Sequence, residues 1–178
     1  NFFMKLKIIA AVFLILLGIK TTNAQVNLND SLLAYLPLNG NANDLSGQNN
    51  NANATLNGVY PALNRQGIQN QSLFFNGEHE QGLLDFGSPL LNGRTQLTVS
   101  LWFNVSSLLN GMSIFGQDNL FEIGFYTGPN RLSIFHPTSG TTNVSLSATL
   151  NTWQHLAITT TSSQMRIYLN GILMNTIN

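Results

Sequence analysis

The chain of 178 residues contains no cysteine, and only 8% of its residues are charged. The lack of cysteine excludes disulfide bonds, a cysteine nucleophile and lipid attachment to a cysteine, so stability must come from a packed core or a bound ion. Lysine is absent beyond residue 20. From Gln25 onward there are four arginines and seven acidic residues, a net charge of −3, which excludes nucleic acid and anionic membrane surfaces as partners.

A short apolar segment lies near the N-terminus. Two lysines precede an apolar run at residues 8–19, and residues 22–24 (Thr-Asn-Ala) offer a small-residue cleavage site, as in a secretory signal peptide. The run is shorter than the ~20 residues that a membrane span needs, and a short membrane anchor is the alternative. We therefore expect a signal peptide region at 1–24 starting at Met4, a short linker at 25–30, and a secreted or cell-surface protein without membrane insertion after signal removal.

No long segment has the period of a helix, whereas short alternating runs are frequent. In residues 97–105 (LTVSLWFNV), apolar residues from Val99 onward alternate with Thr, Ser, Trp and Asn, which predicts a strand buried on one face. Residues 152–159 (TWQHLAIT) and 165–174 (MRIYLNGILM) also read as strands. Asn170-Gly171 predicts a hairpin, because both central residues of a type I′ turn need positive φ. The pattern favours an all-β protein.

Two earlier segments complete an ordered set: residues 32–47 (LLAYLPLNGNANDLSG) and 72–77 (SLFFNG). With the Trp102 and Trp153 strands following, the chain resembles a laminin G-like domain, bacterial secreted type, of the concanavalin A-like lectin/glucanase (jelly-roll) superfamily. The resemblance covers about residues 31–178. It implies a single all-β domain built as an antiparallel two-sheet jelly-roll sandwich.

The resemblance also implies how the sheets are completed. Residues 32–38 are expected to be a strand, beside which a late strand of the family normally pairs. Similar domains continue for several strands beyond the hairpin, so we expect the domain at 31–178 to be C-terminally truncated, with 32–38 as an exposed edge. A complete but minimal sandwich is the alternative.

The loop at 39–47 is rich in the oxygen donors that Ca²⁺ prefers. In domains that this chain resembles, the acid at the position of Asp44 can join a structural calcium site completed near the C-terminus. The alternative is an Asx-turn, in which Asp44 bonds to nearby backbone. Both remain open, and a bound calcium would serve stability.

Strand alternation also suggests a ligand surface. Polar and aromatic residues fall opposite the apolar ones in three runs, so they could line one face of a sheet. Such a face suits sugars and equally suits protein contacts. The alternative is that Trp102 and Trp153 only pack within the protein. The candidate ligand-binding residues are Trp102, Glu122, Tyr126, Arg166 and Tyr168.

Catalytic patterns are weak. Glu78 and Glu80 are the only close acidic pair, and they follow Asn76-Gly77 in what reads as a solvated turn rather than a glycosidase pair. No nucleophile elbow or phosphate loop is present. We predict no enzyme activity, and instead a non-catalytic extracellular recognition module for carbohydrate or protein, within a larger secreted or surface protein. The alternatives are a fragment of a polysaccharide-degrading enzyme of the same superfamily and a structural adhesion or spacer domain.

Overall fold

The chain divides into two compact units, Asn1–Leu32 and Leu33–Asn178. In the first unit the described residues form a turn, in which the Asp30 amide donates to the Asn27 carbonyl at 3.1 Å. The expected signal peptide region lies outside the described residues. The computed structural model describes residues 27, 29–54, 58–77, 82–107, 111–126, 131–136, 140–146 and 148–178.

The second unit is all-β wherever the structure describes it. Its strands form two four-stranded sheets, ordered β12-β11-β10-β5 and β6-β7-β8-β9, and two pairs, β1-β4 and β2-β3. Every pairing is antiparallel. Within the described ranges, no helix has the length and hydrophobicity that a membrane crossing requires. The strands are β1 (Asn53–Ala54), β2 (Val59–Ala62), β3 (Ser72–Phe75), β4 (Leu84–Asp85), β5 (Leu97–Phe103), β6 (Met112–Gln117), β7 (Phe121–Phe125), β8 (Arg131–His136), β9 (Gly140–Ser145), β10 (Gln154–Thr160), β11 (Met165–Leu169) and β12 (Ile172–Ile177).

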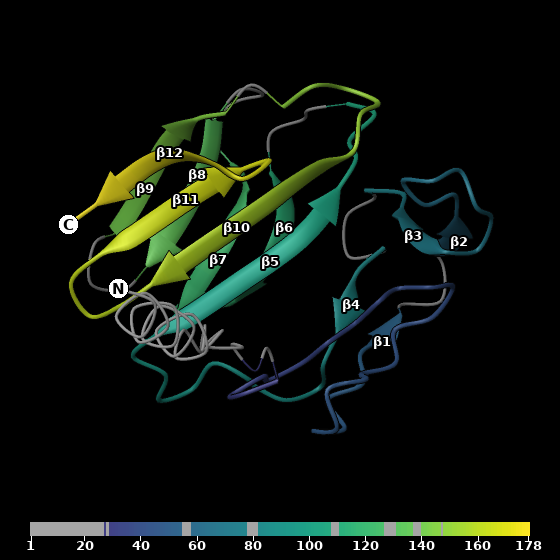
Figure 1. Ribbon diagram of the computed structural model, residues 1–178, viewed down its shortest axis with the longest axis horizontal. Helices are drawn as coiled ribbons and strands as arrows, with labels where there is room; N and C mark the ends of the chain where they lie inside the picture. The colour runs from purple at the N-terminus through teal and green to yellow at the C-terminus, as the bar shows by residue number, and fades with distance from the viewer. Residues whose placement is uncertain are drawn as a thin grey trace, which may run out of the picture. The chain divides into compact units, whose positions relative to one another are not determined.

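All four strands of the second sheet lie between β5 and β10 in the sequence. After β5 it passes through β6, β7, β8 and β9, and only then returns with β10 to pair with β5. In Figure 1 the sheet β12-β11-β10-β5 lies in front and the sheet of β6 to β9 lies behind it. This two-layer antiparallel arrangement is that of the predicted jelly-roll sandwich.

Apolar side chains from the facing surfaces of both sheets form one core. Burial of such a side chain stabilises the fold by about 1.5–3 kcal/mol. Strand β5 adds a half-buried apolar row, from Leu97 to Phe103, to the same cluster. The buried members are Phe121, Ile123, Phe125, Leu132, Ile134, Val144, Leu156, Ile158, Met165, Ile167 and Leu169 from the strands, and Leu91 and Leu146 from connecting segments.

The hairpin predicted at Asn170-Gly171 is confirmed. Strands β11 and β12 pair on either side of it, and the turn residues have φ values of 50° and 81°. Asn170 tolerates positive φ better than most residues, and Gly171 has no Cβ to oppose it.

The strand expected at residues 32–38 is wrong, because the structure assigns no strand there. Pro37 has no amide hydrogen to donate, and Leu38 has a φ of 56°, which breaks an extended backbone. The Tyr35 carbonyl instead accepts a hydrogen bond from the Leu45 amide at 2.8 Å. The segment is therefore held by the loop that follows it rather than by a neighbouring strand.

Candidate functional site

Trp102 lies on the outer face of β5. The strand alternates strictly, so its odd-numbered residues turn toward the core while Thr98, Ser100 and Trp102 turn outward. The Trp102 side chain is 46% exposed, whereas Trp153, just before β10, is half-buried. Trp102 is thus not a core aromatic, and its indole is available on the surface of the sheet.

Antiparallel pairing places other side chains in rows beside Trp102. Trp102 pairs with His155 of β10. The next outward row runs from Ser100 through Ala157 to Tyr168 of β11, and the third runs from Thr98 through Thr159 to Arg166. Three of the five predicted ligand-binding residues, Trp102, Arg166 and Tyr168, therefore share the outer face of one sheet.

Two side chains surround the Trp102 ring. The guanidinium carbon of Arg65, from the loop between β2 and β3, lies 4.6 Å from the ring centroid, which is cation–π geometry. The His155 ring lies 5.1 Å away at an interplanar angle of 50°. His155 Nε2 is in turn 2.9 Å from the Ser100 hydroxyl. Sequence reasoning missed both Arg65 and His155, although His155 alternates with Leu156 in a way that predicts an outward position.

The β11-β12 turn holds the His155 end of this face in place. The His155 amide donates to the Asn170 Oδ1 at 2.8 Å, and the Asn170 amide donates to the His155 carbonyl at 2.8 Å. Because both bonds involve the backbone of His155, the β10 end of the row formed by Trp102 and His155 is tied to the β11-β12 turn.

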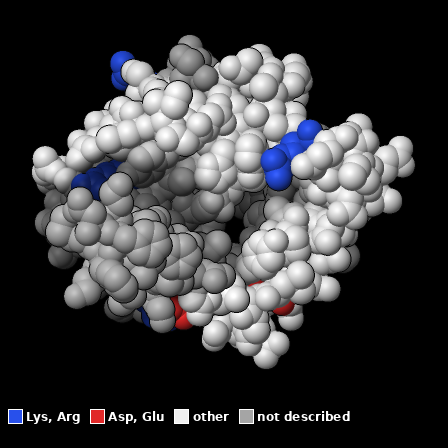
Figure 2. All heavy atoms as spheres, in the orientation of Figure 1, with Lys and Arg blue, Asp and Glu red and all other residues white. Residues whose placement is uncertain are grey.

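The two arginines of this face have no carboxylate partner among the residues that the structure describes. Neither the Arg65 nor the Arg166 guanidinium forms a hydrogen bond or ion pair with a described residue, and the Arg65 guanidinium lies over the Trp102 ring. The outward rows contain no acidic residue among those described. Figure 2 shows how sparse charges are, since its described surface is mostly uncharged with isolated blue and red patches. None of the acids that the structure describes therefore neutralises the charge on these arginines.

Glu122 and Tyr126, the other two predicted ligand-binding residues, lie elsewhere. They belong to β7 and the residue after it, in the second sheet. A Cβ added at Gly124 would lie 2.7 Å from Tyr126 Cζ, so the tyrosine ring covers this glycine. Glu122 accepts a hydrogen bond from the Asn119 amide at 3.2 Å. The structure thus separates these two residues from Trp102, and it uses both within their own sheet.

Asp44 organises the loop that follows residue 38. Its Oδ1 accepts hydrogen bonds from the amides of Tyr35 and Ser46, both at 2.8 Å. Its Oδ2 accepts from the Ser46 hydroxyl at 2.8 Å and from the Asn50 amide at 2.9 Å. Partial burial raises the pKa of Asp44, but these hydrogen bonds outweigh it and lower the pKa from 3.8 to about 2.

This donor set does not fit a calcium ion. A carboxylate has about four lone-pair positions, and N–H or O–H groups of the protein take four hydrogen bonds at Asp44. Ca²⁺ is held by oxygen lone pairs, and this carboxylate has none left over from the four hydrogen bonds that it accepts. The bond from the Ser46 amide is that of the Asx-turn alternative.

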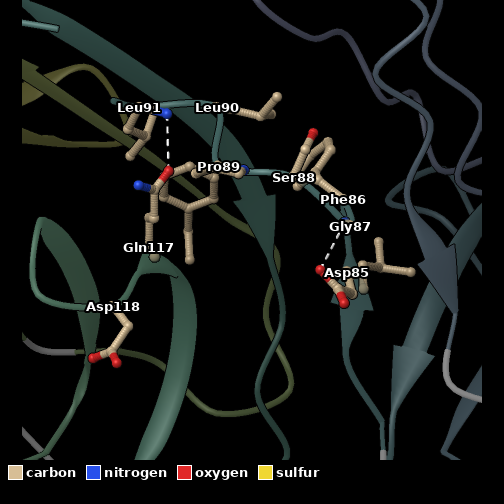
Figure 3. Close-up of a pocket in the computed structure, with 12 residues that line it drawn as sticks. Asp85, Phe86, Gly87, Ser88, Pro89, Leu90, Leu91, Gln117 and Asp118 are labelled. Carbon is tan, nitrogen blue, oxygen red and sulfur yellow. Dashed lines mark hydrogen bonds between the residues drawn. The ribbon is translucent and has the colours of Figure 1, made fainter. Parts of the chain in front are cut away.

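A concavity of about 420 Å³ lies beside β4 and the turn between β6 and β7 (Figure 3). Gln117 bridges its upper side, because its Oε1 accepts from the Leu91 amide at 2.9 Å and its Nε2 donates to Asn92 at 2.7 Å. Asp85 and Asp118 lie on opposite sides of it in Figure 3, and Asp85 bonds to the Gly87 amide at 2.8 Å. Its polar groups serve the surrounding loops and do not converge on one point.

Most of the acidic side chains that the structure describes accept hydrogen bonds from residues close to them in sequence. The Glu78 and Glu80 pair lies outside the described residues. Of the described acids, Asp30, Asp44, Asp85 and Glu122 accept hydrogen bonds from neighbours close in sequence.

Comparison with known proteins places the chain in a family. No curated protein matches the chain. A solved structure from Bacteroides ovatus ATCC 8483, described as a "putative carbohydrate binding protein", is similar at 21% identity and a TM-score of 0.43, over 49% of this chain and 27% of that one. Residues 76–178, more than half of the chain, match the family Laminin_G_3, described as the concanavalin A-like lectin/glucanases superfamily. The chain therefore belongs to this laminin G-like family of the concanavalin A-like lectin/glucanase superfamily.

Proposed function

We propose that the chain is a secreted or cell-surface, non-catalytic module that binds carbohydrate on the outer face of the sheet β12-β11-β10-β5. The observation that carries the proposal is the exposed indole of Trp102, flanked by Arg65 and His155. A side chain of this size is usually buried when it has no external partner. Membership in a superfamily of lectins and glucanases supports a sugar as that partner.

The chemistry of the face suits a sugar ring. Pyranose rings present C–H groups on their faces and hydroxyls at their edges, so they pack on an aromatic ring while bonding to polar groups around it. Ser100, His155 and Arg65 supply hydrogen-bonding groups next to the Trp102 indole. In the neighbouring row, Ser100 and Ala157 are small, so no long side chain separates Trp102 from Tyr168.

The non-catalytic role and the export of the protein are supported by separate observations. A non-catalytic role is supported by the loop hydrogen bonds of four described acids, because a glycosidase needs two carboxyl groups free to face the scissile bond. Export is supported by the signal peptide pattern at residues 1–24. Calcium is not part of the proposal, since the Asp44 donor set does not fit it.

The test is a titration of the protein against a panel of neutral and charged oligosaccharides, followed by calorimetry or intrinsic fluorescence. We expect Trp102→Ala to weaken binding about tenfold or more, since burying half of an indole contributes about 1–2 kcal/mol. Trp102→Phe should restore part of the affinity because it keeps an aromatic face. Asp118→Asn is the matched control at the concavity beside β4, and it should bind like the unchanged protein.

The outcomes separate the two locations. Loss of binding in Asp118→Asn with normal binding in Trp102→Ala would move the site to that concavity and refute the proposed face. Thermal unfolding of each variant shows whether it is folded.

A protein ligand is the second candidate, and the β2-β3 hairpin favours it. Tyr60 and Phe74 pair across the two strands, and each is 50% exposed. Leu63 and Ile68 in the connecting loop are 54% and 56% exposed. Exposed apolar groups on this scale are typical of contact surfaces. If Phe74→Ser abolished adhesion to a protein ligand while the Trp102 variants did not, this second function would replace the first.

A further inference from the structure

We propose that the carbohydrate bound by this face is anionic, carrying carboxylate or sulfate groups that pair with Arg65 and Arg166, and that it is an oligosaccharide rather than a single sugar. The inference rests on the proposed carbohydrate function and adds the chemical class of the ligand.

Arg65 has no acidic partner among the described residues. Its guanidinium lies over an indole instead of against a carboxylate, so its N–H groups donate no hydrogen bond and its charge forms no ion pair with a described residue. Stacking on a ring also restricts the guanidinium, so less conformational freedom remains to be lost when a ligand binds. A planar fork of N–H donors is the group best suited to pair with carboxylate or sulfate oxygens.

The charged residues of this outer face differ in sign from most of those elsewhere in the described chain. The described residues include four arginines and five acidic residues, yet the outward rows and the residue stacked on them contain two arginines and no acid. The face is thus positive in a chain that is otherwise slightly acidic. A neutral sugar gains nothing from this separation of charge, whereas an anionic sugar is attracted to the face and kept from the rest of the surface.

The distance between Trp102 and Arg166 sets a minimum length for a ligand that uses both arginines. Trp102 and Arg166 are four residues apart along the strand direction and two strands apart across the sheet. At ordinary strand spacings this is about 14 Å along and about 10 Å across, or about 17 Å between their backbones. One sugar ring cannot reach both arginines, so a ligand that uses both must have several units.

The experiment uses two matched pairs of probes. Polygalacturonate fragments are compared with the same fragments after full methyl esterification, and dextran sulfate is compared with dextran. Esterification removes the carboxylate charge while keeping the sugar backbone, and the second pair tests sulfate separately. The protein variants are Arg65→Gln and Arg166→Gln, with Arg131→Gln on β8 of the second sheet as the control that removes the same charge elsewhere.

We expect the anionic member of at least one pair to bind about tenfold more tightly than its neutral partner, with the gap shrinking at high ionic strength. Arg65→Gln should abolish this preference, and Arg131→Gln should keep it. Arg166→Gln should weaken binding of long anionic fragments but not of galacturonate itself, because a monosaccharide cannot span the face.

Different failures contradict different claims. Equal binding of charged and neutral partners, both lost in Trp102→Ala, would overturn the anionic preference and leave the carbohydrate function intact. An anionic preference that survives both arginine substitutions would also overturn the assignment. Absence of binding to every glycan would refute the carbohydrate function and, with it, this inference.

Discussion

Replacing Asp44 by asparagine tests how the loop after residue 38 is held. The substituted side chain would keep one acceptor oxygen, but its amide group would face the Asn50 amide and the Ser46 hydroxyl where Asp44 now accepts from both. The Ser46 hydroxyl can rotate and accept instead, but the Asn50 amide can only donate, so it would face another donor and lose its hydrogen bond. We therefore expect Asp44→Asn to lower the free energy of unfolding.

The magnitude follows from the pKa of Asp44. A fall from 3.8 to about 2 corresponds to about 2.4 kcal/mol, and because the side chain is partly exposed, solvent screening reduces the expected contribution to about 1–2 kcal/mol. The folded-state pKa is the lower one, so this contribution is complete well above pH 3.8, decreases as the pH falls through 3.8, and is lost as the pH falls through about 2.

The assay is denaturant unfolding of the unchanged protein and of Asp44→Asn between about pH 2 and pH 7. The difference in unfolding free energy should be constant above about pH 5, shrink below it, and nearly vanish at the acid end. Asp118→Asn removes the same charge at an acid without a described hydrogen bond, and its effect should stay within about 0.5 kcal/mol. A pH-independent difference, or none at neutral pH, would refute the reasoning.

Two further predictions concern packing. Gly124→Ala should destabilise the fold by about 1–3 kcal/mol in thermal unfolding, because the new Cβ would collide with the Met112 carbonyl and the Tyr126 ring; normal stability would show that the ring does not lie over this glycine. Ile167→Val should cost about 1 kcal/mol, since Ile167 is fully buried, whereas Ile172→Val, at a side chain that is 68% exposed, should cost almost nothing. Equal effects of the two would contradict the described core.

The local alternation of residues predicts individual strands, but it does not predict which strands pair with one another. Alternation in residues 97–105 gives the inward and outward faces of β5, and Asn170-Gly171 gives the hairpin. Residues 32–38 alternate less clearly and include Pro37, which should have weakened the strand prediction. Pro37 is a local signal against a strand, but whether the rest of the segment finds a partner strand depends on distant residues.

The candidate site shows the same limit. Trp102, Arg166 and Tyr168 share one face because β5 and β11 both flank β10, whereas Glu122 follows a similar local pattern in the other sheet. Arg65 is 37 positions before Trp102, in a loop without any motif, so no spacing rule could have associated them. Only the tertiary structure places that guanidinium on that ring.

The order of strands in the front sheet has a consequence for folding. Phe103 and Gln154 are paired neighbours although the whole second sheet lies between them in sequence. Closing a loop of about 50 residues costs about 3.5 kcal/mol of chain entropy, which the local meanders β6 to β9 and β10 to β12 do not have to overcome. We expect those meanders to form first and β5 to dock last. The row of Trp102 and His155, which spans that late junction, would then be assembled only in the final step, so a chain with β5 undocked would have Arg166 and Tyr168 in place on β11 but not the indole beside His155.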